Sequence, residues 1–452
     1  TFAASAQSPP AGGAATEGNA LRIDLGTALR LADERNLDIA IYLARVTEAS
    51  ARLARARSLG IPTLRVGAGY NRHTGNIQET GGQVIDADRV SRFVGIGAGS
   101  VGPGDLALDV DIGDAIFAPL AARQDRAAAE SESDANRHAV LLDVATAYLA
   151  WLQAREESRI AAEILDRATD LATMTSSYAR AGEGLEADAQ LAAVQPLLWR
   201  QRRLAAEQRA EAAAAALTRL LHLDAAVRLD PMESEVPVID LYSVDDDVNA
   251  LVERALEGRP ETDQLDSLVA AGEAELRAQR YGLFVPKVSL RFSSGDFGGG
   301  PGSSIADTGH RDDLTLQLYW QLDQLGFGHR ALTNEKRAQL RQTELRRDKL
   351  RDAIAAEVRD DYTEAQSLRA QMQLSASAVE QAQGAYTLHR RRIFDRQGLP
   401  LEALQAMSAL ADAEMSALTA TVGFSAAQIR LHTALGNPVD AAQIERGSSN
   451  PP

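Results

Sequence analysis

The seven histidines are the first residues of this chain that could do chemistry, by binding a metal ion or by moving a proton at neutral pH. They stand at positions 73, 138, 222, 310, 329, 389 and 432. None of them belongs to an HExxH motif or to another spacing typical of metal ligands. Each histidine is therefore interpreted as a surface or packing residue, and neither a metal site nor a cofactor is predicted.

Glycine-rich stretches are the second candidate, because a GxG turn before a helix can hold a phosphate group. The glycines at 67, 69, 95, 97 and 99 lie in or beside alternating, strand-like sequence and do not open a helix. The stretch "SSGDFGGGPG" (293–302) lacks the lysine of a P-loop. Nothing in the sequence brings a serine, a histidine and an aspartate together. No enzymatic activity is predicted.

The charge and composition of the chain also exclude some classes of function. The 452 residues include 47 Lys and Arg and 63 Asp and Glu, which gives a formal net charge of −16. This balance would repel a nucleic-acid backbone, so no nucleic-acid partner is predicted. Arginines alternate with acids at helical spacing, as in "LRRDKLRDAIAAEVRDD" (345–361), which is typical of solvated helix faces. The absence of cysteine excludes thiol redox chemistry and, in the chain as given, an N-terminal lipidated cysteine.

The ends of the chain are expected to be disordered, over 1–20 and 440–452. The opening "TFAASAQSPPAGGAATEGNA" resembles the start of a mature secreted chain whose signal peptide has been removed. No run of about 18 apolar residues occurs, so no transmembrane helix is predicted.

The chain contains an internal repeat. The segment that ends in "GIPTLRV" at 66 matches the one that ends in "FVPKVSL" at 290, and "VATAYLAWLQA" (144–154) matches "VRDDYTEAQSL" (358–368). Farther on, "YARAGEGLEA" (178–187) matches "FDRQGLPLEA" (394–403). Because these matches come in the same order, they predict a duplicated unit. The two copies cover 21–223 and 248–439, and an acidic, proline-containing linker joins them over 224–247.

Each copy is predicted to run helix, strand, loop, strand, long helix, break, long helix. For the first copy these elements are a helix over about 25–58, strands 62–70 and 105–113 around loop 71–104, and helices 117–181 and 185–222. For the second copy they are a helix, strands 286–293 and 314–323 around loop 294–313, and helices 330–396 and 400–436. A helix of this length extends roughly 100 Å, which predicts a coiled coil or a helical barrel.

The four predicted strands have two unlike faces. Leu314, Leu316 and Leu318 alternate with polar residues, and the other three strands alternate in the same way. A soluble sheet packed on helices would show this pattern, and so would an outer-membrane barrel that is apolar outside and polar inside. Four strands cannot close a barrel, so several copies would have to share one. The predicted lumen residues are Arg65, Asp109, Asp111, Lys287, Arg291, Gln317 and Asp323.

The order of these motifs over about 21–439, together with the closing "ALGNPV" (434–439), resembles the TolC-type outer-membrane efflux channels, the outer membrane factor family. The resemblance implies a mainly α fold with a β-barrel part. Long coiled-coil helical hairpins would form a periplasmic α-barrel, and four strands per protomer would enter a shared, trimeric, 12-stranded transmembrane β-barrel. The implied protein is a homotrimer in the outer membrane of a Gram-negative bacterium, with a large periplasmic portion.

The resemblance also implies function and partners. Such a channel is the passive exit duct of a tripartite efflux pump or a type I secretion system, and carries substrates from the periplasm or the adaptor to the exterior. It docks a periplasmic adaptor (membrane fusion protein), and through it an inner-membrane transporter. Its docking tips would be the two helix breaks, at Gly182, Gly184, Leu185, Gly398, Pro400 and Leu401.

One departure from the family concerns the pore. Acids often follow the second tip in this family, but Leu404 and Met407 stand there in this chain. An acidic constriction would therefore use Glu186, Asp188 and Glu402, with solvated helix-face acids as the alternative. The acids predicted in the barrel lumen, together with the negative net charge, favour cations as the preferred ions. A soluble coiled-coil scaffold or tether is the alternative function.

Overall fold

The computed structural model describes residues 20–95, 106–233, 235–243, 246–301, 308–321, 326–395 and 399–440. The segments predicted to be disordered therefore lie, except for Ala20 and Asp440, outside the described residues. The chain divides into two compact units. We call Thr1–Ala40, Asn136–Arg259 and Ile354–Pro452 the bundle unit, and Ile41–Ala135 and Pro260–Ala353 the sheet unit. Each unit thus combines segments of both sequence copies.

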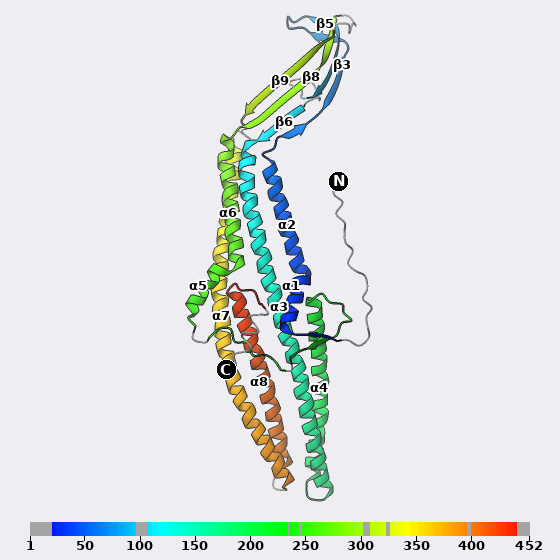
Figure 1. Ribbon diagram of the computed structural model, residues 1–452, viewed down its shortest axis with the longest axis vertical. Helices are drawn as coiled ribbons and strands as arrows, with labels where there is room; N and C mark the ends of the chain where they lie inside the picture. Colours follow the sequence, from blue (N-terminus) through cyan, green and yellow to red (C-terminus); the bar gives the residue numbers. More distant parts are fainter. Residues whose placement is uncertain are drawn as a thin grey trace. The chain divides into compact units, whose positions relative to one another are not determined.

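The element order repeats along the chain (Figure 1). The helices are α1 (Leu25–Arg35), α2 (Leu37–Ser58), α3 (Ile112–Arg180) and α4 (Glu186–Leu220), then α5 (Val248–Gly258), α6 (Pro260–Tyr281), α7 (Phe327–Phe394) and α8 (Pro400–Ala434). In the described parts of the chain no helix is long and apolar enough to cross a membrane.

The single helix predicted over 25–58 is two helices. Asn36 separates them, because its Oδ1 accepts a hydrogen bond from the backbone N–H of Asp38 at 2.8 Å and so caps α2. Its Nδ2 donates to the carbonyl of Leu220 at 3.0 Å. The same break recurs between α5 and α6, where Pro260 opens the second helix in the position that proline prefers.

The bundle unit has the main hydrophobic core. Alanines and large apolar residues from α3, α4, α7 and α8 form it, as 3.6-residue periodicity requires. Its largest fully buried side chains include Tyr148, Ile164, Leu217, Met407 and Leu410. The Tyr148 hydroxyl donates to the carbonyl of Ile23 at 3.1 Å and also contacts Glu233, so the core is tied to both the N-terminal strand and the linker.

The linker between the copies is an ordered part of the bundle unit. Strand β1 (Leu21–Ile23) pairs in parallel with β7 (Leu229–Pro231) inside it. Beyond β7, the linker crosses α8 at three polar side chains one turn apart. Ser425 Oγ accepts from the N–H of Ile239 at 3.1 Å, and Gln428 Oε1 accepts from the N–H of Tyr242 at 2.9 Å. The Tyr242 hydroxyl lies 2.8 Å from Nδ1 of His432. We call Ser425, Gln428 and His432 the linker clamp.

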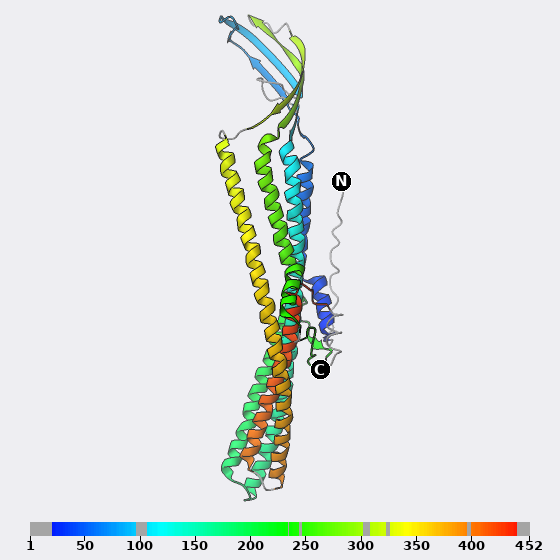
Figure 2. The same ribbon diagram turned by 90° about the vertical axis from the view of Figure 1, so that its left-hand side faces the viewer.

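Ion pairs join neighbouring helices of the sheet unit. Arg45 on α2 pairs with Glu132 on α3 at 3.1 Å, and Lys336 on α7 pairs with Glu275 on α6 at 2.8 Å. Helices α6 and α7 lie side by side (Figure 2), and Gly272 allows this, because a Cβ there would stand 3.2 Å from the side chain of Leu340.

The sheet of this unit is antiparallel. Its strands are β2 (Thr63–Arg65), β3 (Ala68–His73), β4 (Asn76–Gln78), β5 (Val84–Gly95), β6 (Leu106–Asp111), β8 (Lys287–Pro301) and β9 (Thr308–Tyr319). Strand β9 pairs with one side of β8. On the other side of β8, Leu106 of β6 stands opposite Phe292 and Gly95 of β5 stands opposite Ser293. Strands β5 and β6 therefore pair with successive stretches of the same edge of β8 and together occupy one position in the sheet. Strands β2 and β3 together occupy the next position outward.

The structure corrects several predicted strand bounds. The predicted loop 71–104 contains β4 and β5, and the predicted loop 294–313 contains most of β8 and the start of β9. The predicted strand 62–70 is divided between β2 and β3, and the strand predicted over 105–113 ends at Asp111, where α3 begins. The long helices begin and end within about five residues of the predicted positions.

Candidate functional site

The first candidate site is the sheet, whose two faces differ in chemistry. Register places Leu290 of β8 between Leu108 and Leu316, and Val288 between Val110 and Leu318. These residues form an apolar face together with Leu64, Phe292 and Leu314. The face is uncovered within its unit, since Leu314, Leu316 and Leu318 are 72%, 65% and 58% exposed. Three such leucines side by side in water are typical of a surface that another phase or molecule covers.

The opposite face of the sheet is polar. Lys287 stands opposite Asp111, and its Nζ lies 3.1 Å from the Asp111 carboxylate. On the two strands beyond β8, Arg65 of β2 forms an ion pair with Asp109 of β6. The structure places six of the seven predicted lumen residues on this polar face, namely Arg65, Asp109, Asp111, Lys287, Arg291 and Gln317. The seventh, Asp323, lies outside the described residues.

The sheet is open at both edges. In the described part of the chain, β9 pairs only with β8, and β2 and β3 pair only with β6 and β5. Each edge therefore presents backbone N–H and C=O groups without a neighbouring strand. Hydrocarbon cannot satisfy such groups, so an apolar face with two open edges needs further strands before it can enter a membrane.

The second candidate site is the turn between α3 and α4. Gly182 has φ +76°, the left-handed conformation that ends many helices. Its N–H bonds to the carbonyl of Ala179 at 3.0 Å, and the N–H of Glu183 bonds to the carbonyl of Tyr178 at 2.9 Å. This pair of bonds is a Schellman motif, which satisfies the last carbonyls of α3. The chain then reverses, and Leu185 at the start of α4 is 68% exposed.

The turn between α7 and α8 is the counterpart in the second copy. Gly398 lies outside the described residues, so its predicted role is not placed. Leu399 precedes the helix in an extended conformation, and Pro400 takes its first position. Leu401 is 46% exposed.

The two turns lie at the same end of the bundle unit, the lower end in Figure 1. A hydrogen bond joins their helices, because the Tyr178 hydroxyl donates to the carbonyl of Phe394 at 3.4 Å. Leu185 and Leu401 therefore belong to one end surface, although 216 residues separate them.

The three acids predicted to form a constriction have different surroundings. Glu402 forms an ion pair on α7, since its Oε2 lies 3.2 Å from Arg392, and the same oxygen lies 3.3 Å from His389 Nδ1. No ion pair is found for Glu186 or Asp188 with any residue that the structure describes. Both stand in the first turn of α4, where the helix dipole favours negative charge.

The pKa of one partly buried carboxyl of α7, that of Asp361, is raised. Burial raises the pKa of Asp361 to about 6, and the nearby Glu357 and Glu364 add to this rise. Arg430 of α8, whose Nε lies 3.5 Å from Asp361 Oδ1, opposes it only in part. The sequence offered no sign of this group, because the charge run 345–361 looked uniformly solvated.

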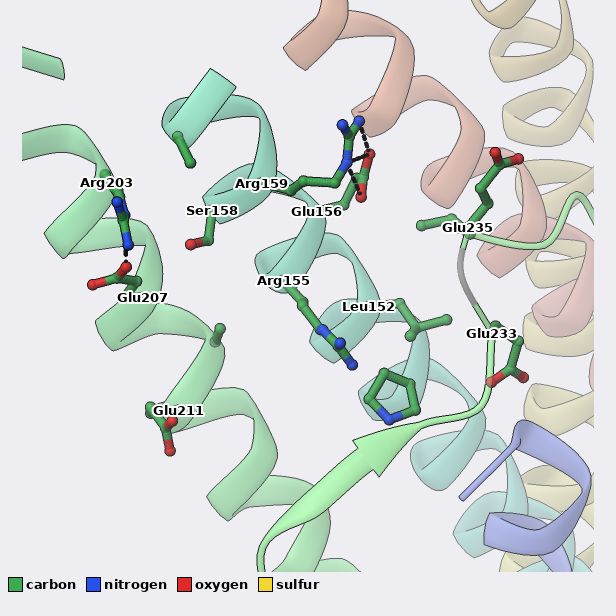
Figure 3. Close-up of a pocket in the computed structure, with 14 residues that line it drawn as sticks. Leu152, Arg155, Glu156, Ser158, Arg159, Arg203, Glu207, Glu211, Glu233 and Glu235 are labelled. Carbon is green, nitrogen blue, oxygen red and sulfur yellow. Dashed lines mark hydrogen bonds and ion pairs between the residues drawn. The ribbon is translucent and has the colours of Figure 1, made fainter. Parts of the chain in front are cut away.

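A pocket of about 410 Å³ also lies between α3, α4 and the linker (Figure 3). Two ion pairs lie in its lining, since Arg203 donates to Glu207 at 2.8 Å and Arg159 donates to Glu156 at 2.8 Å. Sequence reasoning did not find this pocket, whose lining combines helix-spaced ion pairs with the linker.

Comparison with known proteins relates the chain to outer-membrane channels. Residues 251–437 match the family model of the outer membrane efflux proteins. No curated protein matches the chain. The outer-membrane channel OprN is 19% identical with a TM-score of 0.76, and the match covers 91% of this chain and 90% of that one.

Two further solved structures are similar over comparable lengths. The Campylobacter jejuni outer membrane channel CmeC is 14% identical with a TM-score of 0.74, covering 94% of this chain and 89% of that one. The Vibrio cholerae outer membrane protein VceC is 18% identical with a TM-score of 0.72, covering 91% and 96%. The predicted mainly α fold with a β part is thus confirmed. The resemblance to the TolC-type outer-membrane efflux channels is confirmed as well: most of the second copy matches the efflux-protein family model, and the chain has the fold of these channels.

Proposed function

We propose that this chain forms the passive exit duct of a tripartite efflux pump or a type I secretion system in the outer membrane, with a large periplasmic portion. The apolar face with open edges carries the proposal. A surface of Leu314, Leu316 and Leu318 beside charged residues on the opposite face matches a sheet with lipid on one side and water on the other.

The open edges support a homotrimer. One chain supplies strands for four adjacent positions of an antiparallel sheet, too few to close a barrel. Three copies would supply 12 strand positions in total. The free edge of β9 in each copy would then pair with β2 and β3 of a neighbouring copy. Closure removes the unpaired backbone groups that hydrocarbon cannot accept.

The two helix turns support an adaptor partner. The turn needs Gly182 for its left-handed backbone, but it has no need of an apolar side chain in solvent. Leu185 and Leu401 are exposed on one end surface, which is typical of a docking site for another protein. We infer that a periplasmic adaptor, bridging to an inner-membrane transporter, binds there with Gly398, Pro400 and the acids Glu186, Asp188 and Glu402 nearby.

Cell fractionation tests the duct itself. We expect the protein in the outer-membrane fraction, as a trimer that survives mild detergent. A monodisperse rod in the soluble fraction would instead support the alternative, a coiled-coil scaffold or tether.

Paired substitutions test the docking surface. Leu185→Asp together with Leu401→Asp should leave the trimer intact and abolish efflux, because two carboxylates on each protomer would have to be desolvated on docking. Leu185→Met with Leu401→Met is the matched control, since methionine keeps the volume and the apolar character. Drug susceptibility of cells with each variant is the measurement. Unchanged susceptibility with the aspartate pair would contradict an adaptor at this surface.

A further inference from the structure

We propose that the sheet end of this channel prefers anions, although the chain as a whole is acidic. The inference rests on the proposed function in one respect, that the polar face of the sheet lines the water-filled lumen. It names the class of solute that the lumen favours, and it reverses the expectation of cation preference that Asp109 and Asp111 raise on their own.

The first step is a census of the polar face by strand register. The described residues on this face include five permanent cations and three carboxylates. The cations are Arg65, Arg89, Lys287, Arg291 and Arg311, and the carboxylates are Asp109, Asp111 and Asp313.

The second step is that every carboxylate of this set forms an ion pair with a cation. Arg65 forms an ion pair with Asp109. Lys287 Nζ lies 3.1 Å from Asp111, and Arg311 Nε lies 2.8 Å from Asp313. Close pairing leaves each of these acids with little net field in the lumen.

The third step concerns the two remaining cations. No ion pair is found for Arg89 or Arg291 with any described residue, and the Nε of Arg291 lies 3.4 Å from the Ser289 hydroxyl. Arg89 is exposed on β5 opposite Gly299 of β8. A Cβ at Gly299 would stand 1.9 Å from the carbonyl oxygen of Asp88, so no side chain can replace this glycine and cover the guanidinium.

The other face of the same strands has the opposite balance. Beyond the apolar face, register places Asp86, Asp88, Asp296 and Asp312 there, with Arg72 and Arg92 as the permanent cations. The acids of the strand ends therefore lie mainly on the side away from the lumen. The net charge of the sequence does not report this separation.

The surplus cations act together in a closed barrel. Three copies would place their Arg89 and Arg291 around one aqueous lumen with low-dielectric walls, which concentrates the field of fixed charges. Rings of arginine favour anions in a pore. Anionic solutes, such as carboxylate or phosphate compounds, would accordingly leave through this end more readily than cations of the same size.

Reversal potentials in planar bilayers with a potassium chloride gradient test the inference. We expect the current through the wild-type trimer to reverse at a potential between zero and the equilibrium potential of chloride. Arg89→Gln with Arg291→Gln should shift the reversal potential toward that of potassium, and Arg89→Lys with Arg291→Lys should restore it. The matched control is Arg72→Gln with Arg92→Gln, which removes the same charge from the same sheet but from the outer face, and should leave the reversal potential unchanged.

The outcomes separate this inference from the proposed function. A conducting trimer that reverses on the potassium side overturns anion preference and leaves the duct standing. Equal shifts for the lumen pair and the outer pair also overturn it, because selectivity would not then depend on the face. A detergent-stable protein that never conducts, in any variant, overturns the duct and the inference with it.

Discussion

The two units use their apolar residues in opposite ways. In the bundle unit, leucines such as Leu410 are completely buried among helices of the same chain. In the sheet unit, Leu314, Leu316 and Leu318 are largely exposed. The free energy that orders the bundle core therefore comes from the chain itself, whereas in the proposed duct the sheet unit would depend on lipid and on further copies. Two substitutions test this difference, and a third tests a partly buried carboxyl of the bundle unit; we take them from the largest expected effect to the smallest.

The largest effect is expected at the apolar face. Leu316→Arg would place a guanidinium against lipid, which is unfavourable by about 2–4 kcal/mol in each copy when the site is near the bilayer centre. We expect the trimer to disappear from the outer-membrane fraction. Gln317→Arg, one residue along β9 and on the polar face, should be tolerated. Equal loss of trimer for both variants would contradict the assignment of the two faces.

A smaller effect is expected in the bundle core. Leu410→Ala should destabilise the protein by about 2–5 kcal/mol, because it removes buried atoms and leaves a cavity among the helices. Leu316→Ala is the matched change in the sheet, and there we expect less than half of that loss, since lipid can fill the space. Thermal unfolding of the trimers in detergent compares the two. A larger loss at Leu316 would mean that the sheet, and not the bundle, supports its own core.

The smallest effect concerns the partly buried carboxyl of Asp361 in the bundle unit. Burial raises the pKa of Asp361 to about 6 in the folded protein, above its value of 3.8 in an unfolded chain. The folded state therefore binds the proton more tightly, so this contribution to stability is complete below pH 3.8 and is lost as the pH rises through 6. Asp361→Asn should remove that dependence and stabilise the protein at pH 7 by about 1–2 kcal/mol, with screening by water taken into account. Unfolding curves at pH 4 and pH 7 measure it, and an unchanged pH dependence in the variant would contradict the role of this group.

The sequence predicted best where local physics and the fold agree. The alternation of Leu314, Leu316 and Leu318 identified β9, because a half-buried strand must alternate. Gly182 marked the end of α3 for a similarly local reason, since a left-handed residue ends a helix. Both features can be seen within a few residues of sequence.

Strand β5 could not be predicted in the same way. Successive side chains of β5 point to opposite faces, but both faces carry charge: Arg92 and Asp88 lie on one face and Arg89 lies on the other. The reason is that β5 extends beyond the apolar face of the sheet. Without an apolar side, the period of two is invisible in the sequence. The pairing of Lys287 with Asp111 was equally hidden, since it depends on register between strands 176 residues apart. The charge of the polar face follows from such pairs, and composition alone pointed the other way.

The linker clamp has a consequence for how the molecule is made. Its three side chains stand on α8. Ser425 and Gln428 accept from the backbone N–H groups of Ile239 and Tyr242, and His432 contacts the Tyr242 hydroxyl, so they bind residues that are synthesised almost 200 positions earlier. The linker cannot dock on α8 until residue 432 has been synthesised, so the first copy cannot finish folding before the second copy is made. A chain that stops short of α8 would leave the N–H groups of Ile239 and Tyr242 without these partners and the core under them uncovered. Proteases would thus meet an open substrate, and only full-length chains would persist.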